Sequence, residues 1–137
     1  MNDRVFLDTN FVIYLYTEDE DNKRNIAYEH VNKDTCITST QVCNEACNIW
    51  FRKYNWNKDK INTHLDEIET VCDEVLLVQR KTINQALSIK DRYGYSYYDS
   101  LILASALEAG CSIILTEDMS DGQLIFSKLK ITNPFGK

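Results

Sequence analysis

The sequence predicts an α/β fold in which a short, mainly parallel central sheet lies between two layers of helices. Short apolar runs typical of buried strands alternate with longer segments whose apolar residues recur at helical spacing. Helix-capping residues or glycines separate these segments. Strands that alternate with helices join into a parallel sheet, which requires helices on both faces. We therefore expect a three-layer α/β/α architecture.

The composition is typical of one compact globular domain. The 137 residues are 44% hydrophobic and include a single proline, and no stretch has the composition of a linker. No apolar run approaches the ~20 residues that cross a bilayer, and Asp3 and Arg4 lie where a signal peptide needs an apolar core. We expect one domain over residues 1–137 in a cytoplasmic protein with no membrane partner.

The first predicted strand leads into three polar residues. Val5 to Leu7 is apolar, and the side chains of Asp8, Thr9 and Asn10 can accept hydrogen bonds from the free N–H groups of a helix start. Asp8 is thus expected at the carboxyl end of a strand, where ligands bind in open parallel sheets. On this stretch alone, the alternative is that Asp8 only caps a helix.

The remaining predicted elements continue the alternation. Gly94 and Gly110 end two of the helices. A weak last strand precedes Asn133 and Pro134. The predicted helices begin near residue 9 and then cover roughly residues 22–32, 40–54, 57–72, 82–93 and 96–109, and the predicted strands cover residues 5–7, 35–38, 75–78, 112–115 and 129–131.

Glu45 places a charge beside a predicted apolar helix face. Val42, Ala46 and Ile49 mark the buried stripe of that helix, and Glu45 lies on or next to it. A charge in this position needs a partner. The alternative is an edge glutamate that reaches water or pairs with a neighbouring base.

Asp99 lies at the start of another predicted helix. Ser96 and Asp99 have the spacing of a capping box, which explains Asp99 without any chemistry. The helix that follows is apolar almost all round and must run through the interior. A carboxylate at the start of such a helix is also well placed to hold a cation.

The predicted strand at residues 112–115 ends as the first strand does. Thr116, Glu117 and Asp118 follow it directly, and Asp121 lies shortly after them. Two parallel strands then carry acids at the same edge of the sheet. The alternative is that loop composition alone supplies an Asp at this place.

A cluster of these acids requires a positive charge. Two carboxylates about 4 Å apart repel by about 4 kcal/mol at an effective dielectric constant near 20. No Lys or Arg lies beside Asp8, Glu45, Asp99 or Asp118 in the sequence. Ligand sets made only of oxygen favour Mg²⁺ or Mn²⁺ over zinc. Such an ion also reverses the local sign of a chain whose net charge is −6, so that phosphate can bind.

The cysteines predict neither a disulfide framework nor a zinc site. Their number is odd, at five, and they form no C-x-x-C pair. Most are expected to be buried thiols that pack as small hydrophobic groups.

The order and spacing of the acidic motifs resemble those of the PIN-domain nucleases, especially the VapC-like ribonuclease toxins of type II toxin–antitoxin systems. The resemblance covers nearly the whole chain, including the ending Asn133-Pro134-Phe135. It implies a PIN-like fold and an Mg²⁺- or Mn²⁺-dependent endoribonuclease. By this resemblance the catalytic and metal-binding carboxylates would be Asp8, Glu45, Asp99 and Asp118, with Thr9, Asn10 and Thr116 as supporting residues.

The identity of the fourth acid stays open at this point. Asp118 matches the T-x-D pattern of the family. Glu117 and Asp121 are close enough in the sequence to replace or assist it.

The resemblance also implies partners. Family members cut structured or single-stranded RNA and leave a 5′-phosphate and a 3′-hydroxyl. A groove among their early helices takes up an amphipathic segment of a cognate antitoxin protein. They also commonly form homodimers.

A stretch of interleaved aromatic and basic residues is a second candidate for contact with RNA. Arg52, Lys53, Trp56 and Lys58 surround a predicted turn between two helices. Bases can stack on such aromatic rings while basic side chains hold phosphates. The alternative is an ordinary solvated turn beside a buried Trp50.

Two other functions are weighed against the nuclease. A PIN-like module that binds protein or RNA without catalysis is one, and the intact acid set argues against it. A phosphatase or phosphoacceptor domain on a similar sheet is the other. The phosphatases need a second Asp two residues after the first, where this chain has Asn10, and receiver domains need a lysine that we cannot place.

Overall fold

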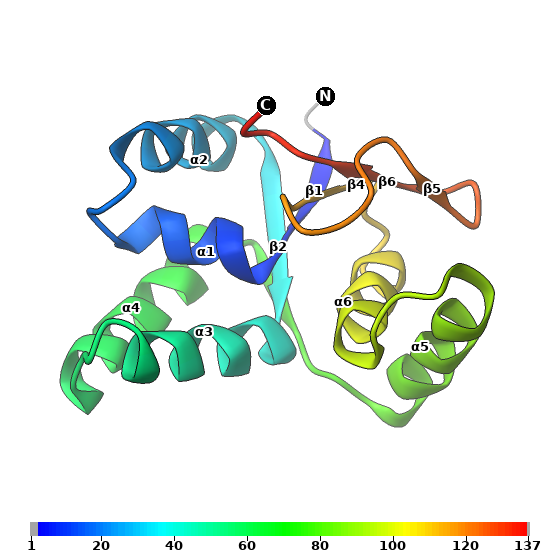
Figure 1. Ribbon diagram of the computed structural model, residues 1–137, viewed down its shortest axis with the longest axis horizontal. Helices are drawn as coiled ribbons and strands as arrows, with labels where there is room; N and C mark the ends of the chain where they lie inside the picture. Colours follow the sequence, from blue (N-terminus) through cyan, green and yellow to red (C-terminus); the bar gives the residue numbers. More distant parts are fainter. Residues whose placement is uncertain (1–2, 137) are drawn as a thin grey trace.

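The computed structural model, which describes residues 3–136, has a six-stranded sheet between helices on both faces (Figure 1). This confirms the predicted mainly parallel α/β architecture. The strands are β1 (Arg4–Leu7), β2 (Thr35–Ser39), β3 (Glu74–Leu76), β4 (Ile113–Leu115), β5 (Leu124–Ile125) and β6 (Leu129–Thr132). The helices are α1 (Thr9–Tyr16), α2 (Asp21–Lys33), α3 (Thr40–Arg52), α4 (Lys58–Val71), α5 (Arg80–Tyr93) and α6 (Tyr97–Glu108).

The sheet reverses its strand order next to β1. The order is β3-β2-β1-β4-β6-β5, and every pair except β5 with β6 is parallel. Helices α1 to α4 lie on one side of the sheet, and α5 and α6 lie on the other (Figure 1). Ligands in open α/β sheets bind in the crevice outside the strand ends at such a reversal. The carboxyl ends of β1 and β4 therefore mark the place to look for a site.

Helix α6 runs through the interior, as its composition predicted. Residues Ser100 to Ala106 are all buried. The helix packs on α5 along its length and also contacts β2 and β4. On the other side of the sheet, Trp50 of α3 and Phe11 of α1 are completely buried. Asp99, at the start of α6, is therefore carried on one of the most firmly packed elements.

Several boundaries and one strand differ from the prediction; helix α3, for example, ends at Arg52 instead of near residue 54. Strand β3 ends at Leu76, and Leu77 is 63% exposed. Helix α5 begins at Arg80, before the predicted start, because Gln79 and Thr82 form a capping box. Strand β5 was not predicted, since it has only two residues and the turn after it lacks the Asn-Gly or Asp-Gly signature of a hairpin.

The cysteines are free thiols, as expected. Cys36, Cys72 and Cys111 are buried, and burial raises the pKa of each of them to about 12. Such thiols are inert packing groups. Within residues 3–136, no helix is both long enough and apolar enough to cross a membrane.

Truncation of α6 tests how much the fold depends on it. We expect Leu103→Ala to lower the free energy of unfolding by about 2–5 kcal/mol, because the cavity left in this packed layer cannot collapse. Leu87→Ala on the exposed face of α5 should cost less than about 1 kcal/mol. Urea denaturation followed by circular dichroism measures both values. Equal losses in the two variants would contradict a core centred on α6.

Candidate active site

The register of two neighbouring strands places Asp8 beside Thr116. Leu7 lies opposite Leu115, so the residues that follow them emerge together at one edge of the sheet. The Asp8 carboxylate accepts hydrogen bonds from the Thr9 backbone N–H at 2.7 Å and from the Thr116 hydroxyl at 2.6 Å. Asp8 thus caps α1, which was its alternative role, and also belongs to a cluster of polar groups.

Glu45 reaches the same edge from α3. Its side chain is half-buried, as its place beside the apolar stripe predicted. The Thr9 hydroxyl donates to Glu45 Oε1 at 2.8 Å, and the Gln41 amide donates to Oε2 at 3.0 Å. Both partners are neutral, so neither offsets the charge of Glu45.

The loop after β4 brings Asp118 to the cluster. The Asp118 backbone N–H donates to the Thr116 hydroxyl at 3.1 Å, and the Asn10 amide donates to the Asp118 carboxylate. Thr116 therefore bonds to Asp8 and Asp118 at once. We refer to the carboxylates of Asp8, Glu45, Asp99 and Asp118, with the side chains of Thr9, Asn10 and Thr116, as the acid network.

The two other acids of this loop have different partners. Glu117 accepts a hydrogen bond from the Tyr14 hydroxyl and forms an ion pair with Lys23 at 3.0 Å. Asp121 accepts a hydrogen bond from the backbone N–H of Asn133 at 2.8 Å and so holds the last turn of the chain.

Lys23 is a cation near the acid network that the sequence did not indicate. Its ammonium also donates to the Tyr14 hydroxyl at 3.1 Å. Burial and the charge of Glu117 raise the pKa of Asp118, whereas the charge of Lys23 lowers it. Sequence spacing could not reveal this group, because 94 residues separate Lys23 from Glu117.

Burial and like charge act together on the deepest acids. Burial raises the pKa of Asp8 to about 6, against the lowering effect of its hydrogen bonds, and the charges of Asp99 and Glu45 add to the rise. Burial likewise raises the pKa of Asp99, and the charges of Glu45 and Asp118 raise it further. The four acids, which come from four separate elements, therefore influence one another electrostatically.

The donor chemistry of the acid network fits a hard divalent cation. Its side chains offer carboxylate, hydroxyl and amide oxygens, which are the ligands that Mg²⁺ and Mn²⁺ prefer. Within the described part of the chain, no three His, Cys, Asp or Glu side chains are close enough together to enclose one ion. The acids thus form a coupled network rather than a closed cage.

A shallow hollow adjoins Glu45 and Asp99. It has a volume of about 560 Å³ and is otherwise lined by Gln41, Asn44, Asn48 and Tyr98. These four residues were not predicted from the sequence as members of the site. The sequence nevertheless contained a clue to three of them. Asn44 and Asn48 lie one helical turn apart on the helix that carries Glu45, and Tyr98 directly precedes Asp99. An exposed aromatic ring and amide groups are side chains that stack on bases and bond to their edges.

The aromatic and basic stretch lies apart from the acid network. Arg52 is about 10 Å from Glu45 along the axis of α3. The ring of Trp56 stacks on that of Trp50, with centroids 5.1 Å apart, and the Lys60 ammonium lies 4.3 Å from its centroid. Contact of this stretch with RNA stays a prediction. Its predicted members Arg52, Lys53 and Lys58 are exposed, and Trp56 is half-buried.

A family model of the PIN domain matches residues 5–120. This chain belongs to the PIN domain family. That match spans β1 to the loop after β4 and so includes every member of the acid network. No curated protein sequence matches the chain.

Several solved structures share this PIN fold. VapC20 of Mycobacterium tuberculosis, a toxin that cleaves the sarcin–ricin loop, is 20% identical, with a TM-score of 0.66 over 83% of this chain and 89% of that one. A toxin–antitoxin complex from Klebsiella pneumoniae is 16% identical, with a TM-score of 0.69 over 95% and 97%. VapBC2 from Rickettsia felis, bound to a DNA fragment from its promoter, is 16% identical, with a TM-score of 0.60 over 95% and 99%. At these identities the likeness concerns the fold.

The raised pKa of Asp8 predicts a pH-dependent stability. The folded PIN domain holds the Asp8 proton with a pKa of about 6 instead of 3.8, so deprotonation between these values lowers the free energy of unfolding as the pH rises. In EDTA at pH 7.5, we expect Asp8→Asn to be more stable than the unsubstituted protein by about 1–3 kcal/mol, with little difference near pH 4. Urea denaturation across this pH range measures the difference.

The matched control for this experiment is Asp91→Asn, which removes an exposed carboxylate of α5. Its free energy of unfolding should follow that of the unsubstituted protein at every pH. A gain for Asp8→Asn that is the same at pH 4 and pH 7.5 would refute burial of a charged carboxylate as its cause.

Proposed function

We propose that this PIN domain is an endoribonuclease that hydrolyses RNA phosphodiester bonds with Mg²⁺ or Mn²⁺. The observation that supports the proposal most is the mutual electrostatic influence of the acids. After burial, the charges of Asp99 and Glu45 raise the pKa of Asp8, and those of Glu45 and Asp118 raise the pKa of Asp99. Carboxylates that repel one another at the reversal point of a parallel sheet form a strong attractor for a divalent cation.

Each carboxylate has a distinct place in this proposal. Asp8 is the deepest, and Thr9 and Thr116 hold both of its oxygens, so it is the most rigid ligand. Glu45 and Asp99 border the hollow, through which a phosphodiester would approach. A divalent ion held by these carboxylates would supply a water of lowered pKa and would neutralise charge on the scissile phosphate. The chain itself binds the ion, orients the RNA strand and restricts the movement of the acids.

Asp118 is the proposed fourth acid. The Asn10 amide and the Thr116 hydroxyl tie it to the acid network. The charge of Glu117 is offset by Lys23, and the carboxylate of Asp121 is occupied by the backbone of Asn133. These contacts favour Asp118 over the two neighbouring acids.

RNA is the substrate that the surroundings of the site favour. Tyr98, Asn44 and Asn48 offer stacking and hydrogen-bonding groups beside the acids, and RNA-binding proteins recognise unpaired bases with such groups. The structurally similar VapC20 is a toxin that cleaves the sarcin–ricin loop. A PIN-like binding module without catalysis is the weaker alternative, because all four acids are retained.

The proposal includes a protein partner that acts as an antitoxin. A polar hollow of about 340 Å³ lies among the early helices, and similar folds occur in toxin–antitoxin complexes. We propose that a segment of the partner occupies this hollow, and we expect the protein to act in the cytoplasm. Homodimer formation stays a prediction. The aromatic and basic groups that line the hollow include Tyr16, Arg24, Tyr28, Tyr54, Trp56 and His64.

Cleavage of total RNA by the purified protein tests this function. With Mg²⁺ or Mn²⁺ we expect products that EDTA abolishes, and Asp8→Asn or Asp99→Asn should lower the rate by at least about 100-fold, because each removes a charged ligand. Asp91→Asn is the matched control and should cleave as the unsubstituted protein does. Undiminished cleavage by both site variants would indicate a contaminating nuclease and overturn the proposal.

The identity of the fourth acid can be tested by metal binding. Asp118→Asn should weaken Mn²⁺ binding by about tenfold or more, whereas Glu117→Gln should change it by less than about threefold, because Lys23 already engages Glu117. Isothermal titration calorimetry measures both affinities. If Glu117→Gln has the larger effect, Glu117 is the ligand instead.

A further inference from the structure

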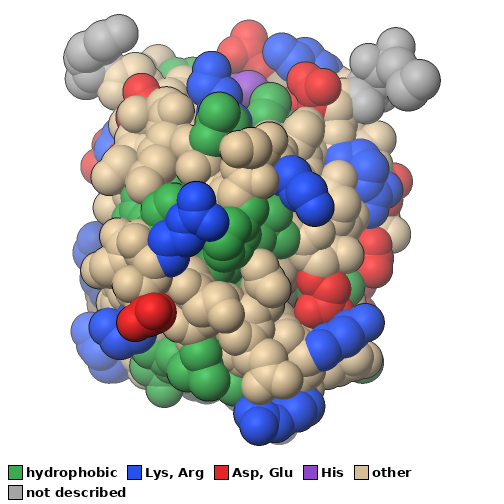
Figure 2. Space-filling view, turned by 90° about the vertical axis from the view of Figure 1, so that its right-hand side faces the viewer, with side chains coloured by type: hydrophobic (Ala, Val, Ile, Leu, Met, Phe, Trp, Pro, Cys, Tyr) green, Lys and Arg blue, Asp and Glu red, His purple; other side chains and the backbone are tan. Residues whose placement is uncertain are grey.

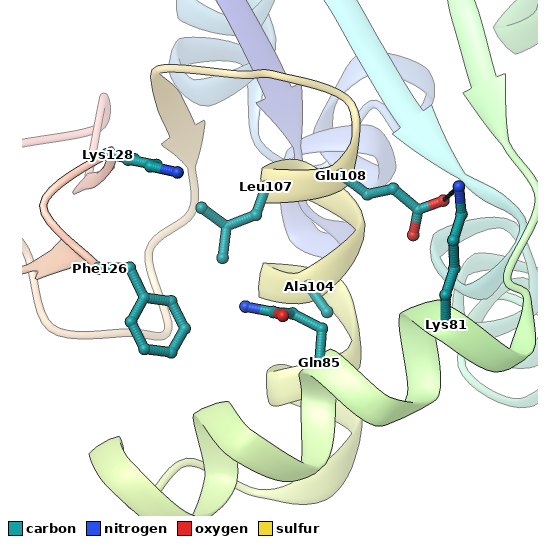
Figure 3. A pocket seen from close by; sticks show the side chains of 7 residues that line it. All are labelled: Lys81, Gln85, Ala104, Leu107, Glu108, Phe126 and Lys128. Carbon is teal, nitrogen blue, oxygen red and sulfur yellow. Dashed lines mark ion pairs between the residues drawn. The ribbon is translucent and has the colours of Figure 1, made fainter.

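A further cleft lies between α5, α6 and the turn that joins β5 to β6 (Figure 3). Its volume is about 390 Å³, within the range of about 300–1,000 Å³ that is typical of small-molecule sites. Along α6 it reaches Glu108, about 13 Å from Asp99, so it is distinct from the acid network. We refer to it as the α5–α6 cleft. Its lining residues are Lys81, Gln85, Ala104, Leu107, Glu108, Phe126 and Lys128.

The walls of the α5–α6 cleft combine apolar surface with an amide. Leu107 and Ala104 of α6 form one wall, and the ring of Phe126 borders the cleft on the opposite side (Figure 3). The side-chain amide of Gln85 points from α5 into the space between them. An amide offers both a donor and an acceptor, which suits the polar edge of a flat, aromatic ligand.

Phe126 is held in an unusual conformation at this cleft. Phe126 and Ser127 have φ angles of 51° and 58°, in a turn where glycine or asparagine is the usual choice. The Phe126 backbone N–H donates to the Tyr93 hydroxyl at 2.8 Å, and the Arg92 guanidinium lies 5.1 Å from the centre of the Phe126 ring. Strained backbone that surrounding contacts maintain is concentrated at functional sites. The strain here fixes an aromatic ring at the edge of a cavity.

The charge around the cleft favours an anion. Glu108 is the one acid of the lining, and it pairs with Lys81 at 3.6 Å and accepts the Thr82 hydroxyl at 2.6 Å. For Lys128, no carboxylate of the described residues 3–136 is within ion-pair distance. Figure 2 shows Lys and Arg side chains, with Asp and Glu side chains interspersed among them, around a hydrophobic patch on this side of the molecule.

We propose that the α5–α6 cleft binds a nucleoside monophosphate unit. The base stacks on Phe126 and packs against Leu107, its edge bonds to the Gln85 amide, and its phosphate binds Lys128. The combination of a ring, an amide and a free cation matches the base, its edge and its phosphate. An apolar peptide would leave the amide and the ammonium unused.

Two sources offer this unit, namely a free mononucleotide and an unpaired nucleotide of an RNA strand. If RNA is the source, the inference rests on the proposed function, and the cleft is an exosite that binds the substrate away from the acids. A free mononucleotide needs no such assumption. Binding measured in EDTA, without cleavage, separates failure of this inference from failure of the nuclease proposal.

The test is an NMR titration of the isotope-labelled full chain in EDTA. One arm uses AMP, GMP, CMP and UMP in turn, and the other uses a five-nucleotide single-stranded RNA. We expect the side-chain amide signal of Gln85 and the backbone signal of Phe126 to shift in a saturable way. A response to mononucleotides alone identifies a free ligand, and a tighter response to the RNA identifies an exosite.

Three variants make the test specific. Lys128→Gln and Phe126→Leu should weaken binding by at least about fivefold, while the matched control Lys130→Gln, an exposed lysine of the neighbouring strand β6, should change it by less than about twofold. Circular dichroism verifies that Phe126→Leu folds, and Lys128→Gln carries the test if it does not.

Three results would overturn the proposal. The first would be that the Gln85 and Phe126 signals do not shift at about 10 mM nucleotide or at saturating RNA. The second would be that Lys128→Gln and Lys130→Gln weaken binding equally, which would indicate diffuse charge attraction. The third would be that sedimentation detects a dimer that Phe126→Leu dissociates, which would identify the cleft as an interface between two copies of this chain.

Discussion

The candidate site depends on the parallel pairing of β1 with β4. Because Leu7 lies opposite Leu115, Asp8 and Thr116 leave the sheet side by side, and the Thr116 hydroxyl can bond to Asp8 while it accepts the backbone N–H of Asp118. A slip of β4 by one residue in this register would turn the side chain of Thr116 to the other face of the sheet, away from Asp8. The loop after β4 would then no longer deliver its acids to the end of β1.

The same arrangement carries a cost in stability. A carboxylate that is buried as Asp8 is, with two further acids near it, keeps its charge only at the expense of folding free energy. The protein limits that cost with neutral donors, namely the Thr9 N–H and the Thr116 hydroxyl, rather than with a basic side chain. Lys23 offsets Glu117 at the edge, and among the described residues 3–136 no basic side chain forms an ion pair with Asp8, Glu45 or Asp99. Under the proposed function, a divalent cation would supply the positive charge that these acids lack.

Structural roles coincide with the proposed chemical roles in two residues. Asp8 and Asp99 both lie in helix-start motifs, with Asp8 capping α1 and the Asp99 backbone N–H bonded to Ser96. A helix cap needs a polar side chain at the end of a strand or loop, and a metal site on a parallel sheet needs carboxylates at the same places. One residue can therefore satisfy both demands. For Asp8 and Asp99, a helix-capping role and the proposed metal-binding role are therefore compatible.

The sequence by itself determined the order of the elements, the buried course of α6 and the acids at the strand ends, because hydrophobic periodicity and capping chemistry are local properties. It missed β5, whose short hairpin has Phe126 and Ser127 at positions of positive φ, where no turn signature was visible. It also could not distinguish Asp118 from Glu117 and Asp121.

Only the tertiary structure shows that these three acids have different partners. Lys23 and Tyr14, which are remote from the loop in sequence, engage Glu117, and Asn133 engages Asp121. The α5–α6 cleft likewise exists only where two helices and a turn meet. The physical reason is that ion pairs and cavities depend on distances between side chains far apart in the chain, which neither composition nor periodicity encodes.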